Sequence, residues 1–596
     1  MKTLNLGILA HVDAGKTSLS ERLLYDVGLI PTLGSVDKGN TQTDTLKIEQ
    51  QRGITIKSTV VSFDLENLKI NLIDTPGHSE FVAEVERALS VLDAVILVIS
   101  AVEGIQSQTL ILANILQRLK IPTLIFINKI DRLGARSDEL VKEIQTKLFP
   151  EILVLNTVQN IGTDFAKTFD IQNLPDPEKL KDWIGKMEIC PIVFGSALVG
   201  EGVPQLLQAL QRYFEPIEDK TTKPLSGKVF KLEIDTKGRI VAYARLFQGE
   251  LKLRQQIPII RINQNDHTEL FGKITKIQGF KNGKQIELKT VEAPEIVKIW
   301  GLDLQIGDWL GVCLRDEVNY FARPNLSVII RPKNPAQSPK LHNALKNLCL
   351  IDPLVSVEQN SENTLSLKLY GEIQQQIIQA FLYDDYGLEV VFEKTQVIYV
   401  EKVVGTGKAF AEKFAPDNLF IATLGISLKP GIQGSGIVFD IGIGRGHLPV
   451  AFQKAIEESV NKTLKQGLYC FEVIDCMVQV TDAGYDSVAT DGGDFRGLTP
   501  ILLQKALKQA TTEIYEPINH FELEFPKDHL NNILAALVKA EAKIDTIAEE
   551  SEKTIIKGTL PVRQTFDLER QIPNLTSGQG LFLWGFEGYQ KYTNNR

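Results

Sequence analysis

The segment Ala10–Thr17, AHVDAGKT, has the residue types and spacing of a phosphate-binding loop. It follows an apolar stretch typical of a buried strand and opens a helical pattern that runs from Lys16 to about Tyr25. Backbone N–H groups in such a loop, together with the start of the helix, attract phosphate. Lys16 would reach the terminal phosphates of a nucleotide, and the Thr17 hydroxyl would bind Mg²⁺. The first position is usually glycine, and Ala10 stands there instead. The predicted phosphate-binding residues are Ala10, His11, Val12, Asp13, Ala14, Gly15, Lys16 and Thr17.

Two further motifs carry residues that could serve Mg²⁺ and water. The sequence DTPGH follows the strand-like stretch KINLI, and its Asp74 could hold Mg²⁺ through a water molecule. Gly77 would let a backbone N–H group approach a γ-phosphate, and His78 stands where a residue that orients water belongs. In RGITI, between this motif and the phosphate loop, Thr55 could complete Mg²⁺ coordination in the triphosphate state only. A Pro-Gly turn after a strand is common, so DTPGH alone is a weak indication.

A fourth and a fifth motif indicate which base is bound. In NKID, the carboxylate of Asp131 could accept hydrogen bonds from N1–H and the exocyclic amine of guanine, a pair that adenine lacks. A backbone N–H group in GSA, after the strand-like PIVF, could meet the guanine oxygen. Each motif is short, but all five occur in the order of a GTPase and each adjoins an expected strand. The predicted base-binding residues are Asn128, Lys129, Asp131, Ser196 and Ala197.

These motifs predict GTP hydrolysis that depends on charge neutralisation at the γ-phosphate. Lys16 and Mg²⁺ would supply positive charge, His78 would orient the attacking water, and Thr55 would hold the metal. His11 also lies near the loop, although a lone histidine is more often structural. No arginine in the motifs is an obvious catalytic finger. We therefore expect slow intrinsic hydrolysis that a large partner accelerates.

The elements around the motifs predict five segments. Alternating strands and helices over residues 1–222, the GTP-binding domain, predict a mostly parallel sheet with helices on both faces. Short strands with glycine turns predict a β-barrel over 223–324, the barrel. The third segment (325–397) and the fifth (519–596) both read βαββαβ, the ferredoxin-like pattern. The fourth segment (398–518) reads as an intervening α/β domain.

Composition limits the class of protein further. The net charge of -9 argues against simple electrostatic coating of nucleic acid, though not against local contacts with RNA. In the barrel, four basic residues could meet RNA, although a solvated strand face is the simpler interpretation of each: Lys228, Arg239, Arg245 and Arg254. The five cysteines include no CxxC pair, which makes a disulfide framework or zinc site improbable. We find no signal peptide and no apolar run approaching about 20 residues, so a cytoplasmic protein without a membrane crossing is expected.

The motifs resemble those of a known family. AHVDAGKT, QQRGITI, DTPGH, NKID and GSA look like the translational GTPases, and DAGKT looks like elongation factor G and its relatives. The segment order resembles elongation factor G over essentially the whole chain. Within that group, LGSVDKGNTQTD, IDTPGHSEFVAEVERALSVLDAVILVISAVEGIQSQT and FINKID are similar to the tetracycline-resistance ribosomal protection proteins. The interval between Asp131 and Gly195 leaves little room for the extra subdomain that elongation factor G typically carries there.

This resemblance implies partners and further site residues. It implies GTP and Mg²⁺ as ligands, and a monomer that acts on the bacterial 70S ribosome and displaces bound tetracycline. Val12 and Ile54 match the family's apolar gate beside the catalytic histidine. The stretch from Tyr485 to Phe495 matches the tip loop that enters the ribosomal decoding region; the tip residues carried over are Tyr485, Ser487, Val488 and Phe495.

Two departures from the family keep other functions open. The tip reads YDSVATDGGDF without the usual proline, and Val488, Gly492 and Gly493 predict a smaller and more flexible loop that loses more entropy on docking. The sequence also stops without the family's usual C-terminal helical tail. One alternative is an elongation factor G-like enzyme for translocation or ribosome rescue. The other is a GTP-dependent binding module that scarcely hydrolyses GTP, against which His78 and Thr55 argue.

Overall fold

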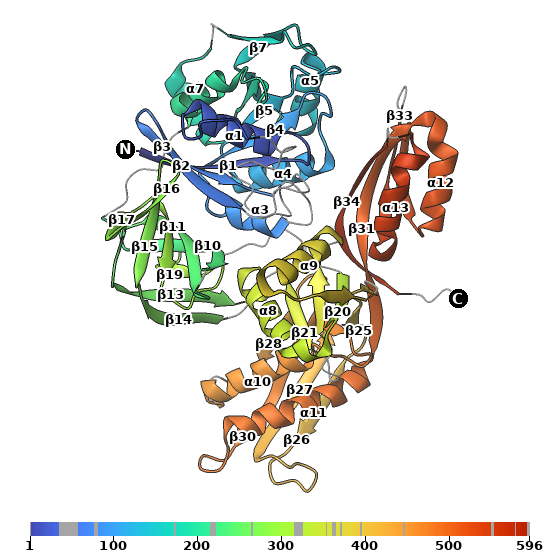
Figure 1. The fold of residues 1–596 in the computed structure, drawn as a ribbon. Coiled ribbons are helices and arrows are strands. Elements are labelled where there is room, and N and C mark those ends of the chain that lie inside the picture. The colour runs from blue at the N-terminus through green and yellow to red at the C-terminus, as the bar shows by residue number, and fades with distance from the viewer. Residues whose placement is uncertain are drawn as a thin grey trace. The chain divides into compact units, whose positions relative to one another are not determined.

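The GTP-binding domain is organised around a seven-stranded sheet (Figure 1). Apart from the edge strand β2, which is antiparallel to β3, all neighbouring strands are parallel. The inner strands are continuous apolar runs, and every residue of β4 (AVILVIS) is buried, as a sheet covered on both faces requires. In sheet order, the strands are β2 (Thr59–Leu65), β3 (Leu68–Asp74), β1 (Lys2–Ala10), β4 (Ala94–Ser100), β5 (Thr123–Asn128), β9 (Cys190–Phe194) and β6 (Ile152–Val154).

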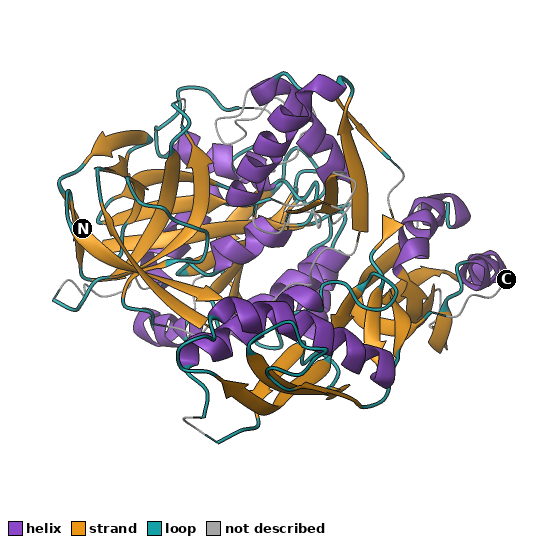
Figure 2. Cartoon of the chain, turned by 90° about the horizontal axis from the view of Figure 1, so that it is seen from below, coloured by secondary structure: helices purple, strands orange, loops and turns teal. Residues whose placement is uncertain are grey.

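Helices cover both faces of this sheet, and each face has its own apolar core beneath the helices (Figure 2). This arrangement confirms the predicted mostly parallel sheet between two helical layers. A short hairpin, β7 (Asn156–Gln159) and β8 (Lys167–Asp170), lies outside the sheet. One core includes residues of α1 (Lys16–Asp26), α6 (Pro177–Gly185) and α7 (Val203–Tyr213), and the other includes residues of α3 (Val82–Leu89), α4 (Ser107–Leu119) and α5 (Asp138–Lys147).

This computed structural model describes most of the chain, which divides into two compact units: Met1–Pro324 with Val328–Lys394, and Asn325–Ser327 with Thr395–Arg596. No helix in the described part is long and apolar enough to cross a membrane. The described residues are 2–34, 58–76, 82–171, 174–214, 222–235, 237–263, 266–314, 326–352, 355–359, 365–369, 372–393, 396–444, 447–549, 553–577 and 580–592.

The barrel is an antiparallel sheet with its own apolar core, as the sequence predicted. Its strands include β10 (Ser226–Ile234), β11 (Ile240–Gln248), β15 (Lys276–Lys281) and β18 (Ile296–Trp300). The remaining strands are β12 (Glu250–Lys252), β13 (Gln256–Asn263), β14 (Asp266–Lys273), β16 (Lys284–Glu287), β17 (Thr290–Glu292) and β19 (Trp309–Gly311).

Arg245 in β11 corrects one expectation from the sequence. Its side chain is 1% exposed, so it neither meets RNA nor lies on a solvated strand face. Its Nη1 donates to the carbonyl oxygen of Val91 at 2.7 Å, and its Nη2 pairs with the carboxylate of Asp93. Alternation along the strand turns Arg245 toward the GTP-binding domain instead of the solvent, so it holds the two domains together.

The third and fifth segments have the same topology. In each, the strands lie in the order second, third, first, fourth, which is the ferredoxin-like arrangement that βαββαβ predicts. The third segment contains β20 (Leu326–Pro332), α8 (Ser338–Ile351), β21 (Ser356–Gln359), β22 (Leu365–Leu369), α9 (Glu372–Tyr386) and β23 (Val390–Phe392). The fifth contains β31 (Thr512–Pro526), α12 (Leu530–Lys539), β32 (Lys543–Glu549), β33 (Lys553–Pro561), α13 (Val562–Leu575) and β34 (Leu581–Lys591).

The fourth segment is a four-stranded sheet in the order β26-β27-β30-β28, packed with two helices. Its elements are β25 (Val400–Val403), β26 (Gly407–Ala411), β27 (Ala422–Pro430), β28 (Ile437–Ile441), α10 (Val450–Thr463), β29 (Glu472–Ile474), β30 (Cys476–Tyr485) and α11 (Gly492–Ala510). Strand β31 pairs at its start with β25 and further along with β33 and β34. The predicted boundary between residues 518 and 519 therefore falls inside one continuous strand.

Candidate functional site

The phosphate loop connects β1 to α1 at the carboxyl end of the parallel sheet. Asp13 and Gly15 have positive φ angles of 65° and 93°. A Cβ on Gly15 would lie 2.2 Å from Nδ2 of Asn128, so both the backbone conformation and the space require glycine. Ala10, in contrast, is the last residue of β1 and pairs with Val98. Its φ is not positive, which explains why alanine can replace the usual first glycine.

Asn128 joins two of the predicted motifs. It ends β5 and is 3% exposed. Its Nδ2 donates to the carbonyl oxygen of Ala14 at 2.8 Å, and its Oδ1 accepts from the N–H group of Ala197 at 2.9 Å. One side chain therefore links the phosphate loop to the GSA loop. This link fixes the position of the predicted phosphate-binding loop relative to the predicted base-binding loop.

The predicted magnesium-binding end of the described site contains a buried ion pair. Nζ of Lys16 lies 2.5 Å from Oδ1 of Asp74, and the two side chains are 7% and 1% exposed. Thr17 is also buried, at 7%. The hydroxyl of Thr75 donates to the carbonyl oxygen of Ile8 at 2.8 Å and anchors the chain directly after Asp74. The Thr17 hydroxyl and the Asp74 carboxylate are hard oxygen donors of the type that Mg²⁺ prefers, so the residues present fit this metal.

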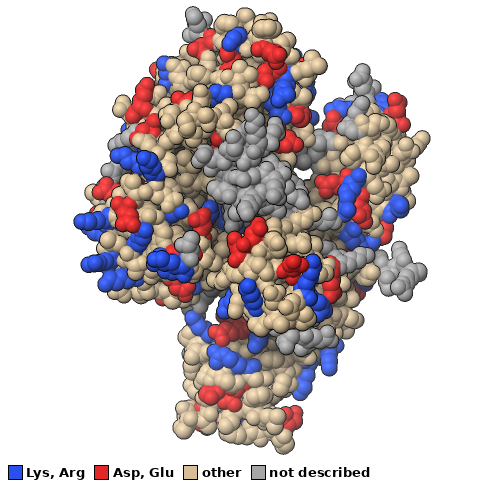
Figure 3. Space-filling view, in the orientation of Figure 1, with Lys and Arg blue, Asp and Glu red and all other residues tan. Residues whose placement is uncertain are grey.

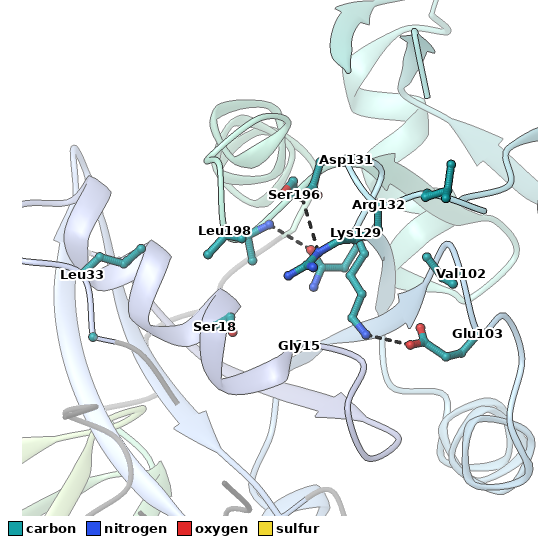
Figure 4. A pocket seen from close by; sticks show the side chains of 14 residues that line it. Gly15, Ser18, Leu33, Val102, Glu103, Lys129, Asp131, Arg132, Ser196 and Leu198 are labelled. Atoms are coloured by element: carbon teal, nitrogen blue, oxygen red, sulfur yellow. Dashed lines mark hydrogen bonds and ion pairs between the residues drawn. The ribbon is translucent and has the colours of Figure 1, made fainter. Parts of the chain in front are cut away.

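A cavity of about 520 Å³ lies beside the phosphate loop (Figure 4). Asp131 lines it with a side chain that is 10% exposed, and Nε of Arg132 is 3.9 Å from its Oδ2. The Lys129 side chain runs along the cavity, and its Nζ donates to Oε1 of Glu103 at 2.9 Å. The volume is in the range of nucleotide and cofactor sites. Its lining joins three predicted motifs through Gly15, Asn128, Lys129, Asp131, Ser196 and Ala197.

The GSA loop is held by residues that lie outside the five motifs. Nε of Arg22 in α1 donates to the carbonyl oxygen of Ala197 at 2.9 Å, and Glu201 accepts the N–H group of Ser196 on its carbonyl oxygen at 2.8 Å. Glu103, which also lines the cavity, was missed as well. The only signal for Glu103 was its place just after β4, at the sheet edge where parallel strands gather functional residues.

His11 has a structural environment. It is 6% exposed, and its Nδ1 lies 3.0 Å from the hydroxyl oxygen of Thr109 in α4. Burial lowers the pKa of His11 to about 4, so the ring is neutral at physiological pH. No described group hydrogen-bonds its Nε2. A neutral, buried ring tied to α4 supports the loop and does not provide positive charge for phosphate.

Four predicted residues of this site lie outside the described residues: Ile54, Thr55, Gly77 and His78. The structure therefore brings together the phosphate loop, Asp74, NKID and GSA. The assignments of Thr55 to the metal and of His78 to the catalytic water stay predictions. The roles of the residues within the cavity also stay predictions.

Within the predicted tip of the fourth segment, Tyr485 to Phe495, the loop itself is residues 486–491, between β30 and α11. Val488 is 94% exposed and Ser487 is exposed, whereas Tyr485 ends β30. Phe495 does not belong to the tip, because it is fully buried in α11, with its ring 5.1 Å from that of Phe452. An Asp491 N-cap places Phe495 on the core face of the first helical turns.

The tip also differs from the expected flexible loop. Gly492 and Gly493 lie in the first turn of α11 and have no positive φ angle. The carboxylate of Asp486 accepts the N–H groups of Val488 and Ala489 at 3.0 and 2.9 Å. The Thr490 hydroxyl donates to the carbonyl oxygen of Ile421 at 2.5 Å. Hydrogen bonds therefore join the loop to itself and to Ile421, directly before β27.

Three family profiles match the chain. "Elongation factor Tu GTP binding domain" matches residues 1–216, "Elongation factor G, domain IV" matches 395–511, and "Elongation factor G C-terminus" matches 513–596. A solved structure from Thermus thermophilus, "Crystal structure of ttk003000868", shares the fold with a TM-score of 0.64 at 22% identity, covering 100% of this chain and 98% of that one.

Curated relatives match almost the full length. The "Oxytetracycline resistance protein" of Streptomyces rimosus is 39% identical over 99% of this chain and 95% of its own length. "Tetracycline resistance protein TetP" of Clostridium perfringens is 37% identical with the same coverage. "Tetracycline resistance protein TetO" of Campylobacter coli is 36% identical over 99% of this chain and 96% of its own. The chain belongs to the tetracycline-resistance ribosomal protection proteins, a family of translational GTPases built like elongation factor G.

Proposed function

We propose that this GTPase binds the bacterial 70S ribosome in the cytoplasm as a monomer and uses GTP to release tetracycline from the small-subunit decoding region. The observation that carries the proposal is the near full-length similarity to proteins named for tetracycline resistance. The guanine-nucleotide site and the exposed tip of the fourth segment lie in the same chain, which supports coupling between hydrolysis and action on the ribosome.

The chemistry of the site follows from the placement of charge. When GTP enters, the Lys16 ammonium would leave the Asp74 carboxylate and bind the terminal phosphates, because a phosphate oxygen offers it more negative charge. Asp131, held in the cavity wall, would accept the two guanine N–H donors, and the N–H groups of the phosphate loop would bind the β-phosphate. His78 would hold the attacking water in line with the γ-phosphate.

The residues for Mg²⁺ would be Thr17, Thr55 and, through water, Asp74. Bound Mg²⁺ supplies neutralisation of the charge on the β- and γ-phosphate oxygens. The chain's own contribution is to keep these oxygen donors at the end of the sheet, where Asp74 pairs in register with Ile8. Among the described residues that line the cavity, the basic ones are Lys129 and Arg132, and Lys129 is paired with Glu103. Slow intrinsic hydrolysis with ribosomal stimulation fits this environment.

Ribosome binding would rest on shape and local contacts. On the face seen in Figure 3, Lys and Arg side chains are interspersed with Asp and Glu, and the chain carries a net charge of -9. Contacts with ribosomal RNA phosphates would still release counterions, so affinity for ribosomes should fall as salt rises. Sedimentation with ribosomes at increasing salt measures this dependence, and an unchanged bound fraction would oppose RNA contact.

Cell-free translation at an inhibitory tetracycline concentration tests the proposed function. Adding the full chain and GTP should restore synthesis, and His78→Ala should abolish the recovery. Val488→Asp should also abolish recovery while leaving ribosome-free GTP binding intact, because Val488 is 94% exposed at the tip. The matched control is Ile432→Asp, which places the same charge at an 83% exposed residue beyond the other end of β27. Loss of recovery with both tip and control variants would oppose a specific role for the tip.

The tip sequence keeps a second function in view. It lacks the proline usual in the family, and an elongation factor G-like role in translocation or ribosome rescue would need no drug release. Ribosome-stimulated GTP hydrolysis without restored synthesis, together with accelerated movement of messenger RNA in a translocation assay, would favour this second function. A chain that binds GTP but fails single-turnover hydrolysis with ribosomes would instead be a GTP-dependent binding module.

A further inference from the structure

The barrel contacts β2, the edge strand of the GTP-binding sheet, through β15. Just before β2, the carbonyl oxygen of Ser58 accepts a hydrogen bond from Nζ of Lys231 in β10 at 2.6 Å. Further along, the carbonyl oxygen of Ser62 accepts the N–H group of Gly283 at 2.9 Å. Carbonyl groups four residues apart point to the same edge of a strand. The barrel therefore hydrogen-bonds to this edge of the chain at two points, one directly before β2 and one within it.

The first of these points adjoins the magnesium end of the site. Thr59, the first residue of β2, is the register partner of Asp74 in β3. Ser58 directly precedes this pair and is 1% exposed. In the sequence, Ser58 also stands three residues after Thr55, the residue predicted to bind Mg²⁺ only in the triphosphate state. The bond from Lys231 thus fixes a point of the backbone between one proposed metal residue and the strand partner of another.

Lys231 is held in place by its surroundings. Its side chain is 7% exposed, and its Nζ lies 2.8 Å from Oε1 of Glu233. The second oxygen of Glu233 accepts the hydroxyl of Tyr243 at 2.8 Å and lies 3.6 Å from Nζ of Lys298. Both ammonium groups lie over the Tyr243 ring, at 4.9 and 4.7 Å from its centre. Few rotamers satisfy these contacts together, so the donor is pre-oriented toward Ser58.

The charges of this cluster favour a role for Lys231 in orienting the backbone at Ser58. Burial would raise the pKa of Glu233, but the neighbouring ammonium groups and the Tyr243 hydroxyl lower it to about 2, so the carboxylate is ionised. Two ammonium groups then share one carboxylate, and the Ser58 carbonyl oxygen is an additional acceptor for Lys231. An ion pair whose carboxylate side chain is 36% exposed contributes little net stability. The hydrogen bond from the buried Lys231 ammonium group to the Ser58 carbonyl oxygen therefore fixes the position of the backbone and adds little to the stability of the fold.

We infer that Lys231 is a positioning residue for GTP hydrolysis, through which the barrel holds the start of β2 beside the magnesium end of the site. It touches neither nucleotide nor metal, and acts through the Ser58 carbonyl. The inference rests on the proposed GTP and Mg²⁺ site. Its effect should fall on the triphosphate state, because Thr55 is the predicted ligand specific to that state, whereas Asp131 and the phosphate loop serve GDP equally.

The experiment compares Lys231→Met with Lys298→Met in the full chain. Methionine keeps most of the apolar stem of lysine but cannot donate to Ser58. Lys298→Met removes the other ammonium group of the same cluster, which contacts Glu233 and Tyr243 but has no described contact with Ser58. Affinities for GDP and for a non-hydrolysable GTP analogue are measured by calorimetry with Mg²⁺ and without ribosomes, and thermal unfolding is recorded for each variant.

For Lys231→Met, we expect the ratio of analogue affinity to GDP affinity to fall about 10-fold, the effect of one charge-assisted hydrogen bond. GDP affinity should stay within about 2-fold of wild type by the same reasoning, and Lys231→Arg, which keeps a donor, should recover part of the ratio. Equal ratios in Lys231→Met and wild type would overturn the inference, as would an equal loss in Lys298→Met. Failure of the wild-type chain to bind the analogue would instead refute the proposed nucleotide site.

Discussion

Replacing Asp131 by asparagine should change the nucleotide that the protein prefers. The carboxylate is 10% exposed in the cavity wall, and a guanine base would give it two N–H donors. Asparagine keeps one acceptor and turns the other position into an N–H₂ donor, which faces the exocyclic amine of guanine. In xanthine, a carbonyl oxygen replaces that amine, so the asparagine pair becomes complementary to the base again.

The size of the change follows from the hydrogen bonds involved. A hydrogen bond to a charged group contributes about 1.5–3 kcal/mol, and the mismatch also leaves two donors facing each other. We expect GTP affinity to fall by about 3 kcal/mol, or about 100-fold. Affinity for xanthosine triphosphate should rise by a similar factor and exceed that for GTP, because the restored pair satisfies both groups.

Equilibrium binding of both nucleotides to the ribosome-free chain measures this exchange. The matched control is Asp176→Asn, the same chemical change at the N-cap of α6, where asparagine caps as well as aspartate. That variant should bind GTP like wild type. Unchanged GTP affinity in Asp131→Asn would refute the assignment of this residue to the base. Weak binding of both nucleotides, with normal unfolding, would mean that Asp131 orders the cavity without reading the base.

Three further outcomes follow from the described contacts. Gly15→Ala should abolish GTP binding, because its Cβ would lie 2.2 Å from Asn128 Nδ2, whereas Gly28→Ala, with a positive φ but nothing within 4 Å, should keep GTP affinity in the same assay. The pKa of His11, lowered from 6.5 to about 4, means that the folded state binds the proton less tightly than the unfolded state, so its stabilising effect is present above pH 6.5 and is lost as pH falls toward 4. Relative to His11→Gln, wild type should lose about 2–3 kcal/mol of unfolding free energy between pH 7.5 and 4.5, and equal losses in urea titrations would contradict a neutral buried ring. Arg245→Met should destabilise the protein by about 3–5 kcal/mol by leaving the carboxylate of Asp93 buried, and Asp93→Asn in that background should recover part of it, as urea unfolding can measure.

The sequence was most informative where one physical constraint acted alone. Strand β4 could be predicted because a strand covered on both faces must be apolar throughout, and AVILVIS is. The phosphate loop could be predicted because its glycine and its placement between strand and helix follow from local geometry. The ferredoxin-like order of the third and fifth segments followed from the alternation of strands and helices alone.

Features that depend on contacts between distant segments could not be predicted. Arg245 looks like a surface residue of a strand until the GTP-binding domain is packed against it. Arg22 and Glu103 reach the site only because α1 and the end of β4 meet the cavity in three dimensions. Phe495 was assigned to the tip because the stretch from Tyr485 to Phe495 resembles the family's tip loop. The pair of Asp491 and Asp494, three residues apart as in a capping box, was the local signal for a helix start that this assignment overlooked.

The continuous strand β31 has a mechanical consequence. Its 15 residues belong first to the ladder with β25 and then to the ladder with β33 and β34, so no hinge can form between these ladders without breaking backbone hydrogen bonds. The fourth and fifth segments should therefore move as a single lever. Spectroscopic labels on α10 and α12 should keep one mutual distance in the GDP state, the GTP state and the ribosome-bound state. Any movement of the tip must then arise from rotation of both segments together. The distance that the tip moves is set by flexible connections outside residues 512–526.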